Sequence, residues 1–242
     1  METTICFDFG NTRLKAAVFG NGELLESFTL PGDGFSFISS LLDKYSPKKT
    51  ILSSVVDHNP QIENLLSSVS SFHKLSHLTK ANFTTPVGKP QSIGADRLAL
   101  AAAAVHYFPG KNNLVIGLGS CITYNFINQY HQFIGGSISP GMEMRFKALH
   151  QYTDKLPLVE PEWSFPLLGY DTKTNMLGGV IGGMAFEMEG FINAYIDKYD
   201  NFNVVLTGGD SSYFARRLKY KIFADSNFLF KGLYALSETN NG

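Results

Sequence analysis

The chain is predicted to be an α/β protein built from two similar halves with mixed sheets, and three observations support this prediction. Each half begins with three short strand patterns and then alternates helical and strand patterns. Each half has a glycine turn between its first two strands, near Gly10 and near Gly119. The stretch Phe108–Asn113 separates the halves. Because residue identity between the halves is low, we interpret them as a duplication at the level of fold.

The first half contains five predicted strands and three predicted helices. Gly20-Asn21-Gly22 is a strong hairpin signal between the second and third strands. Pro47 ends the first helix, because proline cannot continue a helical hydrogen-bond pattern. The strands are expected at Ile5–Phe7, Arg13–Phe19, Glu23–Thr29, Thr50–Val56 and Phe72–Leu78, and the helices at Phe37–Tyr45, Asn59–Leu66 and Leu98–Ala104.

The second half repeats this order. Its long helical stretch carries several glycines in its first half, and its later strand ends in Thr207-Gly208-Gly209. We therefore expect lobes at 1–112 and 113–242 that place the two glycine turns opposite each other across a nucleotide cleft. The strands are expected at Leu114–Leu118, Ile122–Asn128, Gln132–Ser137, Val204–Leu206 and Ile222–Ala224, and the helices at Met142–Tyr152, Asn175–Tyr199, Phe214–Leu218 and Leu229–Leu236.

The composition bounds the class of protein. The 242 residues are 44% hydrophobic and 17% charged, which is enough apolar material for a full core and excludes a disordered chain. Lys and Arg number 20 against 21 acidic residues, so no net field favours nucleic acid or a membrane surface as partner. No apolar run reaches membrane-spanning length, and Met1–Thr4 lacks a basic start. With only two cysteines, a reduced cytoplasmic setting is expected.

The turn Asp8–Thr12 ends the first strand and carries groups suited to nucleotide phosphates. Gly10 lets backbone N–H groups approach an anion, and Asn11 and Thr12 add side-chain donors. Asp8 offers a hard oxygen ligand for Mg²⁺. The alternative is an ordinary hairpin turn, where Asp, Gly and Asn are common for conformational reasons alone.

Five motifs in order resemble those of the type III pantothenate kinases, members of the acetate kinase, sugar kinase, heat-shock ATPase and actin superfamily. The resemblance covers nearly the whole chain. It implies two duplicated ribonuclease H-like, actin-like ATPase domains, a homodimer, and ATP-dependent phosphorylation of pantothenate, the first step of coenzyme A synthesis. The motifs are Asp8–Lys15, Gly94–Arg97, Gly135–Gly141 with Leu149, Thr153 and Leu156-Pro157 after it, Asp171-Thr172 with Gly179, and Leu206–Gly209.

The resemblance also implies a role for each motif residue. Asp96 would be the general base, and Asp8 would hold Mg²⁺. The implied phosphate and nucleotide contacts are Gly10, Asn11, Thr12, Lys15, Ser120, Gly208 and Gly209, and the implied pantothenate contacts are Val87, Gly94, Ala95, Arg97 and Thr172.

Each role has a structural alternative. Asp96 and Thr172 could be helix N-caps, Arg97 could form a surface salt bridge, and Lys15 could be a solvated strand residue. Trp163, with Phe165 beside it, is expected in a loop that packs on the core or at a dimer contact.

Two positions depart from the family pattern. Gly117 stands where the family has an aspartate that helps hold a monovalent cation, K⁺ or NH₄⁺. Val87 stands where an aromatic residue is usual, and Phe83 is a candidate substitute. These departures favour an alternative function, a catalytically impaired relative that binds nucleotide or acts in regulation. A sugar kinase is a second alternative, which Gly94–Arg97 argues against.

Overall fold

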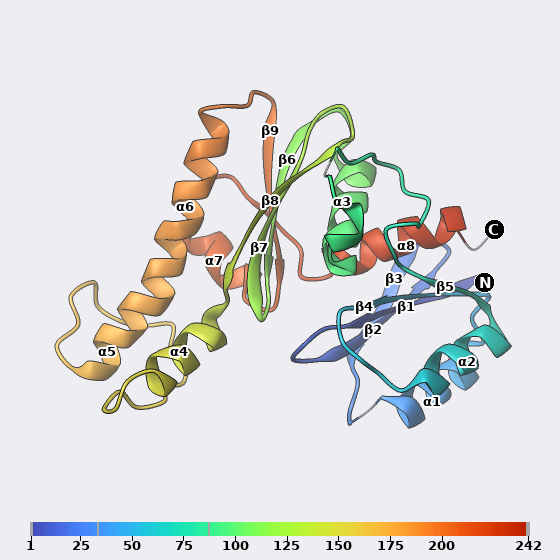
Figure 1. Cartoon of the computed structure of the whole chain (residues 1–242), viewed down its shortest axis with the longest axis horizontal. Coiled ribbons are helices and arrows are strands. Elements are labelled where there is room, and N and C mark those ends of the chain that lie inside the picture. Colours follow the sequence, from blue (N-terminus) through green and yellow to red (C-terminus); the bar gives the residue numbers. More distant parts are fainter. Residues whose placement is uncertain (1, 33, 87, 241–242) are drawn as a thin grey trace. The chain divides into compact units, whose positions relative to one another are not determined.

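The computed structural model describes residues 2–32, 34–86 and 88–240. The chain divides into two compact units (Figure 1). The expected lobes, 1–112 and 113–242, stay a prediction. The compact units have other bounds, because two later segments of the chain, Ile127–Gly135 and Asn227–Gly242, belong to the first unit. Unit 1 comprises Met1–Gly110, Ile127–Gly135 and Asn227–Gly242, and unit 2 comprises Lys111–Phe126 and Gly136–Ser226.

Unit 1 holds a five-stranded mixed sheet in the order β3-β2-β1-β4-β5. Strands β1, β2 and β3 pair antiparallel, and β4 and β5 continue the sheet in parallel with β1. The strands are β1 Thr3–Phe9, β2 Leu14–Gly20, β3 Glu23–Thr29, β4 Lys49–Ser54 and β5 Ser71–Lys74. The helices are α1 Phe35–Tyr45, α2 Pro60–Val69, the 3₁₀ turn Pro90–Ser92, α3 Ala95–Tyr107 and α8 Phe228–Asn240.

The sheet of unit 2 has the equivalent order, β10-β9-β6-β7-β8, with β6, β9 and β10 parallel. The predicted α/β class and the duplication are therefore confirmed at the level of strand order. The strands are β6 Asn112–Leu118, β7 Cys121–Ile127, β8 Phe133–Pro140, β9 Phe202–Gly208 and β10 Phe223–Ala224. The helices are α4 Met142–Gln151, α5 Thr172–Leu177, the π-helical segment Gly178–Gly182, α6 Gly183–Ile196 and α7 Ser211–Arg217.

Alternation along β1 decides which residues form the core and which face the site. Ile5, Phe7 and Phe9 are buried in one cluster with apolar residues of α1 and α2. Side chains alternate between the two faces of a strand, so Cys6 and Asp8 point to the opposite face. Helices α3 and α8 lie on that opposite face (Figure 1).

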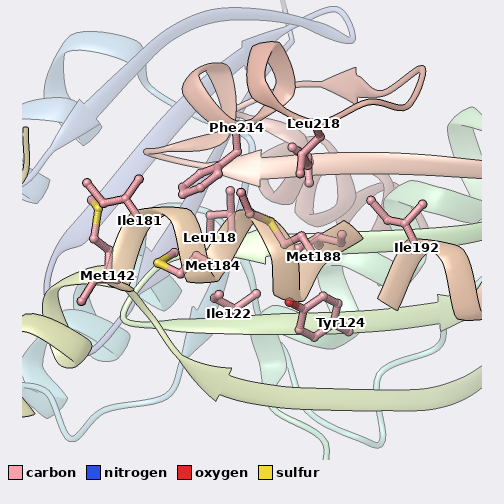
Figure 2. Close-up of a cluster of buried hydrophobic side chains, with 14 of the residues drawn as sticks. Leu118, Ile122, Tyr124, Met142, Ile181, Met184, Met188, Ile192, Phe214 and Leu218 are labelled. Carbon is pink, nitrogen blue, oxygen red and sulfur yellow. The ribbon is translucent and has the colours of Figure 1, made fainter. Parts of the chain in front are cut away.

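The core of unit 2 forms between its sheet and the helices α4 to α7. Figure 2 shows Met184, Met188 and Ile192 of α6 packed over Leu118 and Tyr124 of the sheet. Leu114, Ile116 and Leu118 of β6 belong to this cluster, so the odd-numbered residues of the strand, Gly117 among them, lie on the other face.

The long predicted helix of the second half is interrupted. Residues Gly178–Gly182 are π-helical and separate α5 from α6. Side chains added at Gly178 or Gly182 would lie 4.0 and 3.7 Å from the ring of Phe165. The glycines therefore leave room for Phe165, which packs against the core cluster of this unit.

The predicted strand Phe72–Leu78 is shorter than expected, because the chain turns after Lys74. The Thr79 hydroxyl lies 2.8 Å from Nε2 of His73 and accepts the backbone N–H of Ser76. These local hydrogen bonds replace continued strand pairing.

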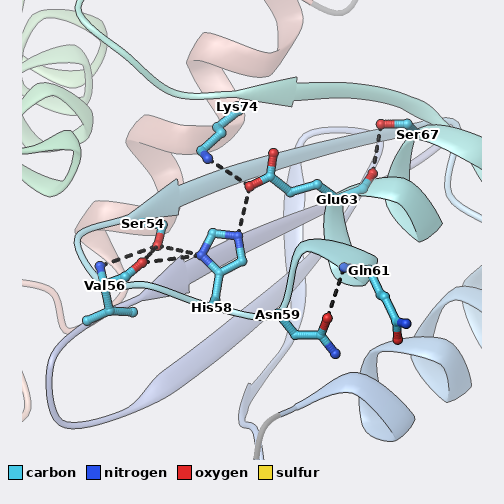
Figure 3. Close-up of polar contacts among 8 residues, drawn as sticks. All are labelled: Ser54, Val56, His58, Asn59, Gln61, Glu63, Ser67 and Lys74. Atoms are coloured by element: carbon cyan, nitrogen blue, oxygen red, sulfur yellow. Dashed lines mark hydrogen bonds and ion pairs between the residues drawn. The ribbon is translucent and has the colours of Figure 1, made fainter.

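The loop after β4 is held by a polar network (Figure 3). His58 Nδ1 lies 3.1 Å from the Ser54 hydroxyl, and its Nε2 lies 2.9 Å from Glu63. Lys74 forms a 2.7 Å ion pair with the same Glu63 carboxylate. Asn59 caps α2 by accepting the backbone N–H of Gln61. This network fixes the chain immediately after Ser53, which lies beside Asp8.

Within the described part of the chain, no helix is both long enough and apolar enough to cross a membrane.

Close packing of α8 on α3 yields a prediction for stability. A Cβ atom at Gly232 would lie 1.9 Å from the backbone oxygen of Ala99. We expect Gly232→Ala to lower the free energy of unfolding by roughly 1–3 kcal/mol, because backbone must shift to relieve the overlap. Thr239→Ala, at an exposed position of the same helix, should change it by less than about 0.5 kcal/mol. Urea unfolding followed by circular dichroism measures both, and equal effects would contradict this packing.

Candidate functional site

A row of three side chains crosses the central strands of unit 1. Asp8 of β1 is paired in register with Lys15 of β2 and with Ser53 of β4. Residues directly opposite each other on neighbouring strands project from the same face. The sequence-predicted residues Asp8 and Lys15 are thus brought together, and Ser53 joins them although nothing in the sequence singled it out.

The carboxyl group of Asp8 is strongly perturbed. Burial raises its pKa first and the charge of Asp96 raises it further, while Lys15 and the Ser53 hydroxyl oppose the change, so that the pKa is about 7. The Ser53 oxygen is buried and makes no hydrogen bond of ordinary geometry with the described residues. The effect of Asp96 on Asp8 indicates that two carboxylates share this region of unit 1.

Asp96 lies in the first turn of α3, but it is not the N-cap. Gly94 takes that position, so the alternative reading of Asp96 as a cap is wrong. Burial raises the pKa of Asp96, and the backbone N–H and positive charge of Arg97 partly offset this increase. Its carboxylate folds back over Gly94, where an added Cβ would lie 2.5 Å from Oδ1. Ala95, the other small residue of the motif, is buried.

Arg97 lies over an aromatic ring that the sequence did not point to. Its guanidinium carbon is 5.4 Å from the centre of the Phe133 ring. Phe133 is buried and meets Phe83 edge to face at 6.4 Å. Phe83, the candidate substitute for an aromatic residue at position 87, therefore contacts the same Phe133 ring that Arg97 contacts. Val87 lies outside the described residues.

The turn between β1 and β2 is closed by its glycine. The N–H of Gly10 donates to the Arg13 carbonyl at 3.1 Å. This amide stabilises the turn itself, so Gly10 shapes the loop rather than supplying a donor. Asn11 and Thr12 lie at its exposed tip.

In unit 2, Gly117 occupies the position equivalent to Asp8. Each is the sixth of seven residues in the first strand of its sheet. Gly117 is paired in register with Thr207 of β9, as Asp8 is with Ser53. The Thr207 hydroxyl is buried and makes no hydrogen bond of ordinary geometry with the described residues, which is also true of the Ser53 hydroxyl. Unit 2 thus has a hydroxyl, that of Thr207, at the position of Ser53, but it has no carboxylate at the position of Asp8.

The turn at Gly119 and Ser120 is packed against the start of α4. The N–H of Gly141 donates to the Ser120 carbonyl at 3.0 Å. A Cβ atom on Gly141 would lie 2.2 Å from the Gly119 oxygen and 2.6 Å from the Ser120 oxygen. Only glycine at position 141 allows the start of α4 to lie this close to the Gly119 and Ser120 carbonyls. The motif that ends in Gly141 therefore packs directly against the turn that holds Ser120.

A network that the sequence did not reveal holds the segment leading into Gly141. Glu187 of α6 accepts the Tyr124 hydroxyl at 2.9 Å and also binds the Ser139 hydroxyl and Arg145. Arg145 donates from Nε to the Pro140 carbonyl at 2.7 Å. Burial would raise the pKa of Glu187, but these donors outweigh burial and lower it. The network joins α4, α6 and the sheet around Ser139 and Pro140.

The two glycines after β9 have different roles. Gly208 has a φ of +100°, and a Cβ atom there would lie 2.0 Å from the Leu118 carbonyl. Its absence of a side chain is therefore required for packing next to the Gly119 turn. Gly209 is exposed, and a Cβ atom there would meet nothing within 4 Å.

Thr172 is exposed in the first turn of α5. Asp171 is the N-cap of that helix and forms a capping box with Thr174. The alternative reading of Thr172 as the cap is therefore wrong, and its hydroxyl is not needed to begin the helix.

The described residues contain no group of three or more His, Cys, Asp or Glu side chains placed to hold a metal ion. Asp8 beside Asp96 still suits Mg²⁺, which commonly takes one or two carboxylates and completes its shell with phosphates and water. Gly117 and Thr207 offer only neutral oxygen atoms. They therefore do not form the kind of monovalent-cation site in which an aspartate at position 117 binds the ion. The expectation that the two turns face each other concerns both units together and stays a prediction.

Comparison with known proteins agrees with these motifs. The family model described as type III pantothenate kinase matches residues 4–194. A type III pantothenate kinase of Christiangramia forsetii is 42% identical over 98% of each chain, and one of Cytophaga hutchinsonii is 40% identical over 98% of this chain and 99% of its own.

Solved structures show the fold. A protein described as a Baf family transcriptional activator from Campylobacter jejuni matches with a TM-score of 0.65 at 21% identity, over 98% of both chains. A ROK family glucokinase from Streptomyces griseus, in complex with glucose and AMPPNP, matches with a TM-score of 0.54 at 12% identity, over 98% of this chain and 99% of its own.

The raised pKa of Asp8 predicts how stability depends on pH. In an unfolded chain an aspartate titrates near a pKa of about 3.9. Between that value and about 7 the folded state binds more protons, so the free energy of unfolding falls as pH rises through this range. Each pKa unit is worth about 1.4 kcal/mol, so the decrease should reach a few kcal/mol.

Asp8→Asn should reduce this dependence to what Asp96 contributes and should raise stability near pH 8, while Asp43→Asn, at an exposed position of α1, should leave the dependence unchanged. Urea unfolding without Mg²⁺ at pH 5, 6, 7 and 8 measures the effect. A wild-type stability that rises over this range would contradict the assignment.

Proposed function

This chain belongs to the type III pantothenate kinase family, and from that premise we propose how its residues carry out the family's reaction. The reaction is transfer of the γ-phosphoryl group of ATP to the primary hydroxyl of pantothenate, the first step of coenzyme A synthesis. The observation that carries the proposal is the pair of half-buried carboxylates, Asp8 and Asp96, which lie in one unit on residues of two family motifs and whose pKa values are both raised.

Asp96 acts as the general base. In phosphoryl transfer the enzyme mainly positions the reactants and stabilises charge, and an aspartate accepts the proton of the attacking hydroxyl. A pKa raised by burial makes Asp96 a better proton acceptor than an exposed aspartate. The oxygen of the pantothenate hydroxyl then attacks the γ-phosphorus, and the bond to the ADP oxygen breaks.

Asp8 and Lys15 serve the phosphate end of the nucleotide. Mg²⁺ bound there would neutralise phosphate charge during transfer. The Asp8 carboxylate would be its protein ligand, since a high pKa in the free protein reflects unfavourable burial that a cation relieves. Lys15, opposite Asp8 in the sheet, adds a positive charge, and the turn from Gly10 to Thr12 lies next to it.

Arg97 and Thr172 are the proposed contacts of pantothenate. The guanidinium fork suits the pantothenate carboxylate, and the Phe133 ring holds it in place. Thr172 has an exposed hydroxyl that its own helix does not use. The alternative of a surface salt bridge for Arg97 stays a prediction.

The position for a monovalent cation, K⁺ or NH₄⁺, would lie at Gly117. Gly117 contributes no side chain, so any such ion would rest on neutral oxygens such as the Thr207 hydroxyl. We expect a cation requirement that is reduced relative to a protein with aspartate at this position.

The proposed working form is a cytoplasmic homodimer. Unit 2 exposes large apolar side chains on α6 and on the loop before α5, which supports a second copy as partner. Among them are Phe186, Leu167, Leu168 and Tyr170, at 64%, 84%, 85% and 81%. The alternative of an impaired relative without catalysis has only Gly117 and Val87 in its favour, against Asp8, Lys15, Asp96 and Arg97 all being present.

An assay of ADP release tests the function. With ATP, Mg²⁺ and pantothenate, we expect pantothenate-dependent turnover, and we expect Asp96→Asn to reduce kcat by about 10²-fold or more because the proton acceptor is lost. Nucleotide binding measured by calorimetry should persist in that variant. Absence of turnover with or without K⁺ would instead favour the non-catalytic relative.

Position 117 yields a separate prediction. We expect Gly117→Asp to make turnover rise several-fold more steeply with K⁺, because a carboxylate would then face the cation position beside Thr207. Gly117→Asn has a similar size without charge and should respond like the wild type. The measurement is the initial rate against K⁺ at constant ionic strength. An identical response of the Asp and Asn variants would refute a cation site at this position.

A further inference from the structure

A buried hydroxyl group lies beside the Asp8 carboxylate. Ser53 is fully buried, and its oxygen makes no hydrogen bond of ordinary geometry with the described residues. Burying a hydroxyl in this way costs free energy, because the group gives up its hydrogen bonds to water. Alanine at this position would avoid the cost. A hydroxyl at such a place is therefore expected to serve the group that it faces.

The group that Ser53 faces is the carboxylate of Asp8. The two residues are paired in register on the parallel strands β4 and β1, so their side chains project from the same face of the sheet. The Ser53 hydroxyl opposes the rise in the pKa of Asp8, because a hydroxyl that points at a carboxylate favours the ionised form. An ionised carboxylate only accepts hydrogen bonds, so the hydroxyl is the donor of this pair.

The backbone around Ser53 is held in place by its neighbours in sequence. The N–H of Val55 donates to the Phe9 carbonyl at 3.1 Å, which continues the contact between β4 and β1 just beyond Ser53. The Ser54 hydroxyl lies 3.1 Å from Nδ1 of His58, on the other face of the strand (Figure 3). Because the end of the strand is held in this way, the Ser53 hydroxyl adjusts to the carboxylate by rotation of its own side chain alone.

We propose that Ser53 is a positioning residue for the phosphoryl transfer of the proposed function, on which this inference rests. Its hydroxyl donates to one oxygen of the Asp8 carboxylate and leaves the other oxygen for Mg²⁺. Groups that hydrogen-bond a metal ligand fix the orientation of that ligand, and their loss typically weakens metal binding by about 10- to 100-fold.

Unit 2 indicates which conservative variant to use. Thr207 stands at the position equivalent to Ser53, in register with Gly117, and its hydroxyl is buried as well. The same architecture therefore accommodates threonine at this position. Ser53→Thr keeps the hydroxyl, and Ser53→Ala removes it.

Calorimetry of ADP binding to the full-length protein, with Mg²⁺ and with EDTA, tests this role without turnover. We expect Mg²⁺ to tighten the binding of ADP to the wild type. Ser53→Ala should reduce this tightening about tenfold and leave the dissociation constant in EDTA unchanged, and Ser53→Thr should restore most of the tightening. Equal tightening in the wild type and in Ser53→Ala, or none in the wild type, would overturn the proposal.

Thr50→Ala is the matched control for a purely structural effect. Thr50 is buried in the same strand on the opposite face, and its hydroxyl lies 2.7 Å from that of Ser70. Its loss should lower the urea midpoint and leave the effect of Mg²⁺ unchanged. Ser53→Ala should keep a midpoint close to that of the wild type, because it loses no ordinary hydrogen bond. The same drop in midpoint in both variants, with the same effect of Mg²⁺, would make Ser53 a structural residue and overturn the proposal.

Steady-state kinetics separate this inference from the proposed function. Ser53→Ala should need about tenfold more Mg²⁺ for the half-maximal rate, with kcat at saturating Mg²⁺ and the KM for pantothenate close to the wild-type values. Pantothenate-dependent turnover with an unchanged Mg²⁺ requirement would overturn the role of Ser53 and leave the kinase. Tightening of ADP binding that depends on Ser53, without any turnover, would support the role of Ser53 and contradict the kinase.

Discussion

The burial of Asp8 beside Asp96 is the interaction on which the site of unit 1 depends. Two carboxylates in a poorly hydrated place repel each other, and the raised pKa of Asp8 expresses that cost. Strand register offsets part of it by setting Lys15 opposite Asp8. In the proposed function, a cation and the phosphates of a nucleotide would relieve the remaining imbalance.

Close backbone contacts explain much of the glycine content of the motifs. Gly141 and Gly208 each face a carbonyl oxygen at a distance no side chain could tolerate, and together they hold both sides of the Gly119 turn. Gly94 differs, because its missing side chain makes room for the Asp96 carboxylate itself. Glycine therefore allows close backbone packing in unit 2, at Gly141 and Gly208, and makes room for a carboxylate in unit 1, at Gly94.

The two units have the same strand order but different side chains at equivalent positions. Asp8 and Gly117 hold equivalent strand positions, and each has a buried hydroxyl without an ordinary hydrogen bond in the neighbouring strand. Only the first unit keeps the charge. The second unit instead carries the Glu187 network, which joins Tyr124, Ser139 and Arg145. The paired carboxylates and the Glu187 network thus lie in different copies of one architecture.

Sequence periodicity determined the order and type of nearly all elements, because strand and helix patterns are local. The motifs that resemble those of the family pointed to Asp8, Asp96 and Arg97. It did not determine the π-helical break, which depends on Phe165 packing against distant glycines. Nor could it find Ser53, Phe133 or Glu187, whose roles arise from partners far away in the chain. Only the tertiary structure decided those contacts, the return of α8 to unit 1 and the pKa of Asp8, because burial and pairing are set by folding rather than by neighbours in sequence.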